Sequence, residues 1–190
     1  GIGLAGRGGV EPAEAAIALR KREYPDDTCY RVVHGEADQI PGLVVDRFGD
    51  YLSVQFLHAG TERRKQLFVD LLTNHFKPKA IVNRSDANVR HLEGLEPEKG
   101  VLTGELPPVI TYREGHVVIE ADLLHGQKTG AFLDQRDNHV RASDYGTGEA
   151  LDCFSYAGGF ALQLALKAKK VTAVEISEPA CEQIKKNAER

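Results

Sequence analysis

The sequence predicts an α/β protein in which an α+β domain precedes the first part of a doubly wound parallel sheet. Residues 28–124 have β-rich runs before and after one helix, which we summarise as the order β-β-α-β-β, typical of a compact α+β unit. Residues 150–189 then run strand, turn, helix, strand, helix, which is how a doubly wound sheet begins. We therefore predict a linker and short helix over 1–27, a central, substrate-side domain over 28–124 and a second domain over 125–190.

The elements predicted before residue 124 follow from periodicity and turn residues. Pro12 in a first turn suits a short helix, and leucines at helical spacing after a capping Thr61 predict a longer one. The β-rich runs surround short Gly-containing connections, as in hairpins. The Gly-, Pro- and Glu-rich stretch 88–108 is expected to be a loop. We predict helices over 11–23 and 61–76, and strands over 30–33, 42–47, 51–57, 80–84, 109–112 and 116–121.

After residue 124 a polar stretch leads into a predicted helix over 132–143. Strands are predicted over 150–154 and 171–176, and helices over 160–167 and 179–189. The first of these strands is expected to be buried. Two parallel strands cannot cover both faces of such a sheet, and the chain contains no Met. We therefore expect this domain to be incomplete and the 190 residues to be a piece of a longer protein.

Composition excludes several classes of protein. The longest uncharged apolar runs, such as Ala157–Leu166, fall far short of the ~20 residues that a membrane span needs, and the start lacks the pattern of a signal peptide. Three widely spaced cysteines without C-x-x-C suit a reducing cytoplasm and argue against a disulfide framework or a zinc site. We expect a cytoplasmic protein without membrane or metal. The net charge of −4 argues against a general basic clamp for nucleic acid.

Two glycine-bearing segments differ in context. Gly1, Gly3 and Gly6 match G-x-G-x-x-G, but no strand precedes them, so we interpret this stretch as a linker. The segment LDCFSYAGGFALQLA instead places a Gly-Gly turn between a strand ending near Asp152 and a helix. Glu175 ends the next strand, where a carboxylate can accept ribose hydroxyls. Because the turn lacks spaced glycines for a pyrophosphate, S-adenosylmethionine suits it better than NAD, with Asp152 facing the cofactor's amino group.

Three segments resemble a known family: HGQKTGAFLDQRDNH, LDCFSYAGGFAL and VTAVEIS. Together with YRVVHGEADQIPGLVVDRFGDYLSVQF, they make residues 20–190 similar to the S-adenosylmethionine-dependent ribosomal RNA large-subunit methyltransferases of the methyltransferase I type. Taken alone, the first segment could equally be a solvated loop leading into a helix. The resemblance implies a PUA domain, a β-β-α-β-β central domain and a Rossmann-like class I methyltransferase domain, with the chain truncated at both ends.

The resemblance also implies a reaction, methylation of 23S ribosomal RNA, with cytosine C5 as the expected target. The nucleophilic Cys and target-base contacts are expected beyond Arg190, so the 190 residues alone are expected to be inactive. Cys153 and Cys181 are interpreted as packing residues. The implied cofactor-binding residues are Gln127, Lys128, Thr129, Gly130, Phe132, Asp134, Arg136, Asp152, Phe154, Ser155, Tyr156, Gly158, Gly159, Phe160 and Glu175.

Some features depart from the family or leave alternatives open. Asp is common where this chain has Glu175, and Arg is common where it has His139. The basic triplets 20–22 and 63–65 could contact RNA phosphates or form solvated helix faces. The first alternative function is a non-catalytic fragment or an RNA-docking or dimerisation module of the same family, and the third candidate is an NAD-dependent oxidoreductase. A homodimer is a separate expectation about partners.

Overall fold

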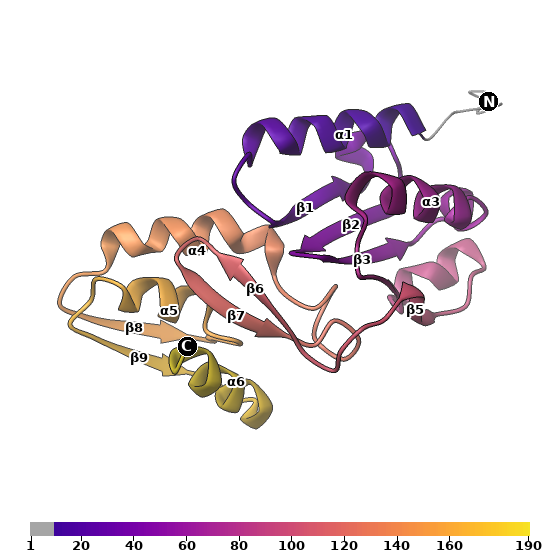
Figure 1. Cartoon of the computed structure of the whole chain (residues 1–190). Helices are drawn as coiled ribbons and strands as arrows, with labels where there is room; N and C mark the ends of the chain where they lie inside the picture. Colours follow the sequence, from indigo (N-terminus) through magenta and orange to yellow (C-terminus); the bar gives the residue numbers. More distant parts are fainter. Residues whose placement is uncertain (1–9) are drawn as a thin grey trace. The chain divides into compact units, whose positions relative to one another are not determined.

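The computed structural model describes residues 10–190, so the G-x-G-x-x-G match at Gly1, Gly3 and Gly6 lies outside the described residues. The chain divides into two compact units (Figure 1). Unit 1 contains the chain up to Val109 together with Asp122–Ala131, and unit 2 contains Ile110–Ala121 and Phe132–Arg190. The domain boundaries predicted at residues 27 and 124 remain predictions. The mixed α/β class is confirmed.

Unit 1 is built on a five-stranded sheet whose strands follow one another in chain order. The β2–β3 hairpin turns at Gly49 and Asp50 and pairs Phe48 with Tyr51. The β3–β4 pair is parallel, whereas β1–β2, β2–β3 and β4–β5 are antiparallel. The strands are β1 (Cys29–His34), β2 (Leu43–Phe48), β3 (Tyr51–Phe56), β4 (Ala80–Ser85) and β5 (Glu98–Gly104).

The helices of unit 1 correct two predictions. The helix predicted over 61–76 is two helices, because Arg64 leaves helical geometry at φ −108° and ψ 15°. The loop predicted over 88–108 contains a 3-10 helix and β5, and β5 forms because its backbone pairs with β4. Thr61 donates its hydroxyl to the His58 carbonyl and caps no helix N-terminus. The helices are α1 (Val10–Glu23), η1 (Gly35–Asp38), α2 (Ala59–Glu62), α3 (Lys65–Phe76) and η2 (Asn88–Glu93).

One hydrophobic core joins the helices to the sheet. Ile17 of α1 and Phe68 and Leu72 of α3 pack with sheet residues that include Val45 and Val54. Figure 1 shows α1 lying beside β1. Each large side chain buried there contributes about 1.5–3 kcal/mol. Because side chains alternate along a strand, the residues next to Val45 point to the opposite face of the sheet.

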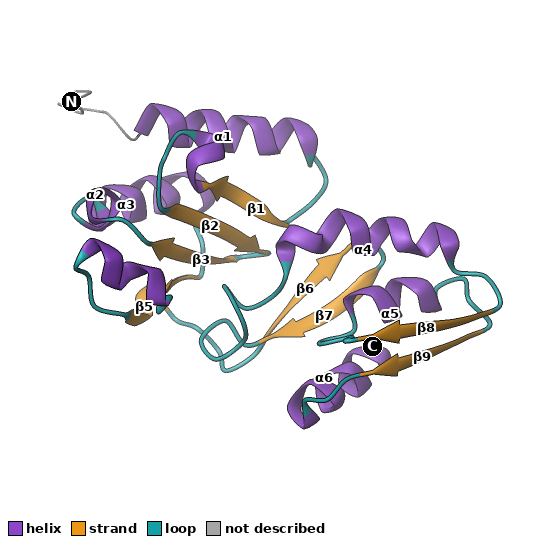
Figure 2. Ribbon diagram, turned by 180° about the vertical axis from the view of Figure 1, so that it is seen from behind, coloured by secondary structure: helices purple, strands orange, loops and turns teal. Residues whose placement is uncertain are grey.

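Unit 2 contains two pairs of strands and three α-helices (Figure 2). The predicted hairpin is confirmed, and so is the order strand, turn, helix, strand, helix with the last two strands parallel. The helix predicted over 132–143 is a short α-helix between two 3-10 turns. The elements are β6 (Ile110–Glu114), β7 (Val117–Ala121), η3 (Leu133–Gln135), α4 (Arg136–Ala142), η4 (Ser143–Tyr145), β8 (Glu149–Cys153), α5 (Gly159–Ala165), β9 (Lys170–Val174) and α6 (Glu178–Ala188).

Helix α6 is tied to the hairpin and to the turn after β8 through one side chain. Asn187 is buried, accepts the Glu120 backbone N–H at 2.9 Å and donates to the Ala157 carbonyl at 3.0 Å. Gln183 donates to the Glu120 carboxylate at 3.0 Å. These bonds satisfy polar groups of three separate segments and fix where α6 lies within unit 2.

The exposure of β8 corrects the prediction of a buried strand. Its residues alternate between exposed and half-buried, and Leu151 is 64% exposed. Within these 190 residues Cys153 is exposed as well, which contradicts its interpretation as a packing residue, because no segment of the described residues packs on alternate side chains of β8. Cys181 is half-buried, with its thiol 3.4 Å from the Glu175 carbonyl oxygen. None of the helices in residues 10–190 is long and apolar enough to cross a membrane.

Candidate functional site

The turn after β8 is organised by Asp152. One carboxylate oxygen, Oδ2, accepts the Ser155 hydroxyl at 2.5 Å and the Ala161 backbone N–H at 3.1 Å. Asp152 therefore joins the end of β8 to the turn and to the first turn of α5. Neither of these bonds uses Oδ1, which leaves a carboxylate oxygen for a donor group.

The backbone of this turn adopts a conformation that side chains rarely take. Phe154 has φ 62°, Tyr156 has φ 48° and Gly158 has φ 88°. Left-handed non-glycine residues cost about 1–3 kcal/mol each and are concentrated at functional sites. Phe154 is 90% exposed, and the Tyr156 ring lies edge-on to Phe132 with centroids 5.0 Å apart. The strain and the exposed aromatic ring both favour a ligand-binding role for the turn.

Glu175 links the end of β9 to the same turn. Its carboxylate accepts backbone N–H groups of Tyr156 at 2.8 Å, Ile176 at 2.8 Å and Ser177 at 2.9 Å. The bonds from Ser177 and Tyr156, followed by that from Ile176, hold the pKa of Glu175 below its ordinary value of 4.5. Glu175 is therefore ionised at neutral pH, and unit 2 places the side chains of Asp152 and Glu175 at the carboxyl ends of neighbouring parallel strands.

A buried cluster behind the turn explains Gly159. A Cβ atom on Gly159 would lie 2.4–2.8 Å from three ring atoms of His139. The His139 ring is 2.8 Å from a carboxylate oxygen of Glu114 and edge-on to Phe160, at 4.4 Å between centroids. Gln163 donates to the Glu114 carbonyl at 2.6 Å. Gly159 is therefore required by the packing of His139 within unit 2, a requirement that the spacing of residues in the sequence could not reveal.

In unit 1 the segment Asp122–Ala131 is fixed to the sheet face opposite the helix core. The Thr129 hydroxyl donates to the Asp46 carboxylate at 2.5 Å, and Arg31 forms a two-bond ion pair with Asp46 at 2.8 and 2.9 Å. Arg84 donates to the carbonyls of Leu123 at 2.8 Å and Gly126 at 2.9 Å. Thr129 was predicted from the sequence, but the residues that hold it and its segment were not. These are the half-buried Arg31 and the buried Asp46 and Arg84, which carry no local signal for these contacts.

The predicted cofactor-binding residues are divided between the units. Gln127, Lys128, Thr129 and Gly130 belong to unit 1, with the first two exposed and the other two buried. In unit 2, Asp134 is exposed, and Arg136 is buried and paired with Asp137. Unit 2 brings together the residues of the turn and Glu175. These are Asp152, Phe154, Ser155, Tyr156, Gly158, Gly159, Phe160 and Glu175, with Phe132 against Tyr156.

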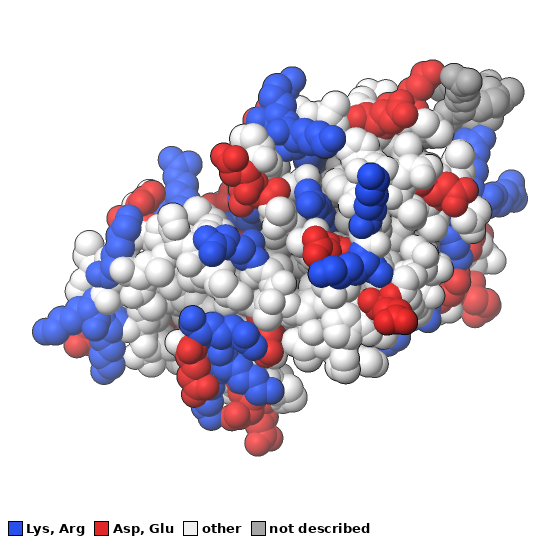
Figure 3. Space-filling model, in the orientation of Figure 1, with Lys and Arg blue, Asp and Glu red and all other residues white. Residues whose placement is uncertain are grey.

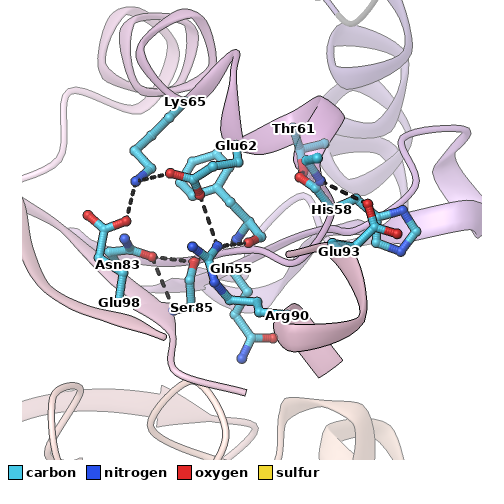
Figure 4. Close-up of polar contacts among 12 residues, drawn as sticks. Gln55, His58, Thr61, Glu62, Lys65, Asn83, Ser85, Arg90, Glu93 and Glu98 are labelled. Atoms are coloured by element: carbon cyan, nitrogen blue, oxygen red, sulfur yellow. Dashed lines mark hydrogen bonds and ion pairs between the residues drawn. The ribbon is translucent and has the colours of Figure 1, made fainter. Parts of the chain in front are cut away.

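A second polar network lies in unit 1 (Figure 4). Arg90 is 3% exposed, donates to Glu62 at 2.9 Å and to the Glu96 carbonyl at 2.8 Å, and also contacts the Phe56 carbonyl. Lys65 pairs with Glu62 at 2.6 Å and with Glu98. Burial raises the pKa of Glu62, but hydrogen bonds from Lys65 and Arg90 outweigh it and leave this pKa below 4.5. The network is a structural ion-pair cluster. Among residues 10–190, no group of three or more His, Cys, Asp or Glu side chains is placed to hold a metal.

The comparisons with known proteins agree with the resemblance seen in the motifs. No family model matches the chain. It is 45% identical over 186 residues to ribosomal RNA large subunit methyltransferase I of Vibrio cholerae and 44% identical over 186 residues to the protein of that name in Aliivibrio fischeri. Each match covers 95% of this chain and 47% of the relative. The chain thus spans about half the length of the curated relatives it matches.

Solved structures with the same fold are also methyltransferases by name. A proposed SAM-dependent methyltransferase from Streptococcus mutans has a TM-score of 0.79 at 19% identity, covering 95% of this chain and 47% of its own. SMU.776, a proposed methyltransferase complexed with SAH, has a TM-score of 0.79 at 20% identity with the same coverage. The M. jannaschii tRNA m1G37 methyltransferase has a TM-score of 0.61 at 17% identity, and the match covers 95% of this chain and 49% of that protein.

Thr129→Val should lower the free energy of unfolding by about 1.5–3 kcal/mol, because it removes a hydrogen bond to a buried charged group. Thr129→Ser keeps the hydroxyl and should lose at most about 1 kcal/mol, for one methyl group. Urea unfolding at neutral pH measures both variants. Equal stability of the valine variant and the wild type would show that the Asp46–Thr129 bond contributes nothing.

Glu62→Gln should lower stability at neutral pH by about 2 kcal/mol, because it weakens charged hydrogen bonds to Arg90 and Lys65. Since the folded-state pKa of Glu62 is lowered, its contribution is present above the unfolded value of 4.5 and is lost as pH falls through the folded-state pKa. The difference between variant and wild type should therefore shrink as unfolding is measured toward about pH 3. Glu182→Gln, in an exposed pair with Lys185, is the control and should have a much smaller effect. A pH-independent difference for Glu62→Gln would contradict this assignment.

Proposed function

We propose that this chain, which belongs over 95% of its length to the ribosomal RNA large subunit methyltransferase I family, forms part of an S-adenosylmethionine-dependent enzyme that methylates large-subunit ribosomal RNA. The observation that carries the proposal is the 45% identity over 186 residues, which spans both units. The NAD-dependent alternative finds no support among these relatives. The non-catalytic alternative, an RNA-docking or dimerisation module, is proposed only for the 190 residues taken without the rest of the enzyme.

The site in unit 2 fits S-adenosylmethionine by its chemistry. When bound, the cofactor supplies a methyl group activated by a positively charged sulfur. The carboxylate of Asp152 has Oδ1 available for the cofactor's amino group, and its charge complements that cation. Glu175, anchored by three backbone N–H groups, retains acceptor capacity for ribose hydroxyls.

These residues position the cofactor and do not themselves take part in bond making. Because the carboxylates are held by hydrogen bonds before any ligand arrives, little conformational entropy is lost when the ligand binds. The exposed Phe154 and the Phe132–Tyr156 pair offer aromatic surface for the adenine ring. A contribution of Gln127–Gly130, Asp134 and Arg136 to cofactor binding remains a prediction.

We propose that the methyl group is transferred to C5 of a cytosine in 23S RNA. This assignment of the target atom rests on the sequence resemblance alone. In that chemistry a thiolate would add to C6 of the base, and C5 would take the methyl group and release S-adenosylhomocysteine. Removal of the C5 proton by a base would then break the C6–sulfur bond and regenerate the thiolate. We assign this nucleophile to no cysteine of residues 10–190. A cytoplasmic location, RNA binding and a homodimer are likewise part of the proposal.

The full-length protein carrying this sequence should transfer labelled methyl groups from S-adenosylmethionine to 23S RNA isolated from cells that lack the enzyme. Asp152→Asn and Glu175→Gln should each weaken S-adenosylmethionine binding at least about tenfold in calorimetry, since each removes a charge facing the ligand. Asp144→Asn, in an exposed pair with Lys167, is the matched control and should bind normally. A wild-type protein that neither binds the cofactor nor methylates the RNA would refute the proposal.

A further inference from the structure

Unit 1 contains a cavity of about 330 Å³ that the predicted cofactor-binding residues do not line. One wall is the 39–41 turn between η1 and β2. The facing wall comes from the start of α2 and from Arg63 and Arg64, where α2 ends and α3 begins. Figure 4 shows His58, Thr61 and Glu93 on this side of the unit. The volume lies at the lower end of the range for small-molecule sites, roughly 300–1,000 Å³.

The wall formed by the turn is held in a strained, defined shape. Gln39 has φ 62°, a left-handed conformation that costs a non-glycine residue about 1–3 kcal/mol. Gly42 has φ 75°, and a Cβ atom there would lie 2.6–2.7 Å from three side-chain atoms of His58. The His58 ring therefore lies directly against the Gly42 backbone. The Leu57 N–H donates to the Gly42 carbonyl at 2.7 Å and fixes the two segments together.

The basic triplet at 63–65 has different roles at its three positions. Lys65 is committed to Glu62 and Glu98. Arg63 is exposed, lines the cavity and, among the described residues, makes no side-chain hydrogen bond or ion pair. Arg64 lines the same cavity. Against these cations stands Glu93, whose carboxylate accepts the Ala59 backbone N–H at 3.2 Å.

The other basic triplet, at 20–22, is engaged differently. Arg20 forms a two-bond ion pair with Asp38, at 2.5 and 2.8 Å. Lys21 and Arg22 are exposed on α1 and are not among the residues that line the cavity of Arg63 and Arg64. Figure 3 shows basic and acidic side chains interspersed over the face that it draws. With a net charge of −4, any affinity for a polyanion must come from local sites, and the 63–64 cavity combines two arginines with a shaped apolar wall.

We infer that this cavity binds one nucleotide of a single-stranded RNA segment. Arg63 and Arg64 contact the phosphate, and the wall of Ile40, Pro41 and the His58 ring receives the base. Single-stranded RNA is recognised by such a combination, with cations on the backbone and flat or apolar side chains against an unstacked base. The inference rests on the proposed function, because it assumes an RNA substrate, and it adds a substrate-binding site in unit 1.

The test compares two charge-matched double variants of the full-length protein. Arg63→Gln/Arg64→Gln and Lys21→Gln/Arg22→Gln each remove two positive charges from unit 1. Fluorescence anisotropy measures their binding to a labelled single-stranded RNA fragment over a range of salt concentrations. The first variant should bind at least about tenfold more weakly than wild type, and its salt slope should fall by about 0.7 for each phosphate that the protein no longer neutralises. The second should bind within about twofold of wild type, and the melting temperature of each variant is measured so that weaker binding is not confused with weaker folding.

Methyl transfer to 23S RNA, measured on the same proteins, separates the two proposals. If the wild type methylates RNA and the two double variants bind it equally well, the nucleotide site is refuted and the proposed function stands. If the wild type neither binds nor methylates RNA, both are refuted. If Arg63→Gln/Arg64→Gln loses binding of inorganic phosphate but binds RNA normally, the cavity is an anion site and the nucleotide assignment is wrong. His58→Ala separates base contact from phosphate contact, because it should weaken RNA binding without changing the salt slope.

Discussion

The buried carboxylate of Asp46 imposes the constraint on which unit 1 depends. An ionised group removed from water costs several kcal/mol unless its charge is paired and its lone pairs are satisfied. Arg31 on the neighbouring strand supplies the opposite charge and donates two hydrogen bonds to the carboxylate. Thr129, from a distant part of the sequence, donates its hydroxyl to the same carboxylate. The sheet can therefore adopt its register at low cost only when the segment Asp122–Ala131 lies against it. Arg84, through two bonds to the backbone of the same segment, adds to this dependence.

Unit 2 uses carboxylates in the same way, to join segments before any ligand binds. Asp152 connects a strand, a turn and a helix, and Glu175 connects the next strand to that turn. Glu114 is buried with His139, whose ring occupies the space that a side chain at Gly159 would need. Each of these acids shapes the turn after β8. The left-handed backbone at Phe154 and Tyr156 is maintained because the surrounding hydrogen bonds over-determine it.

The charges of this protein have different roles even within one short run of sequence. Each basic triplet contains a cation that is ion-paired within the fold, Arg20 with Asp38 and Lys65 with Glu62 and Glu98. The remaining cations differ in where they lie, because the break between α2 and α3 turns Arg63 and Arg64 toward a cavity while α1 keeps Lys21 on an open surface. Three adjacent residues thus provide an ion pair, a helix break and a candidate RNA contact.

The sequence by itself determined the order of the elements, the parallel strand-turn-helix unit with its Gly-Gly turn, and the family resemblance, because each of these is written in local periodicity, turn residues or contiguous motifs. It missed β5, because that strand forms through its pairing with β4, and it missed the break in the helix at Arg64, where the backbone leaves helical geometry. It misjudged Cys153 and the burial of β8, because exposure depends on what packs against a strand. Only the tertiary structure decided the surroundings of Asp46, Glu114 and Arg63. The groups that face these three side chains come from separate segments of the chain, and no local pattern encodes a contact made through space.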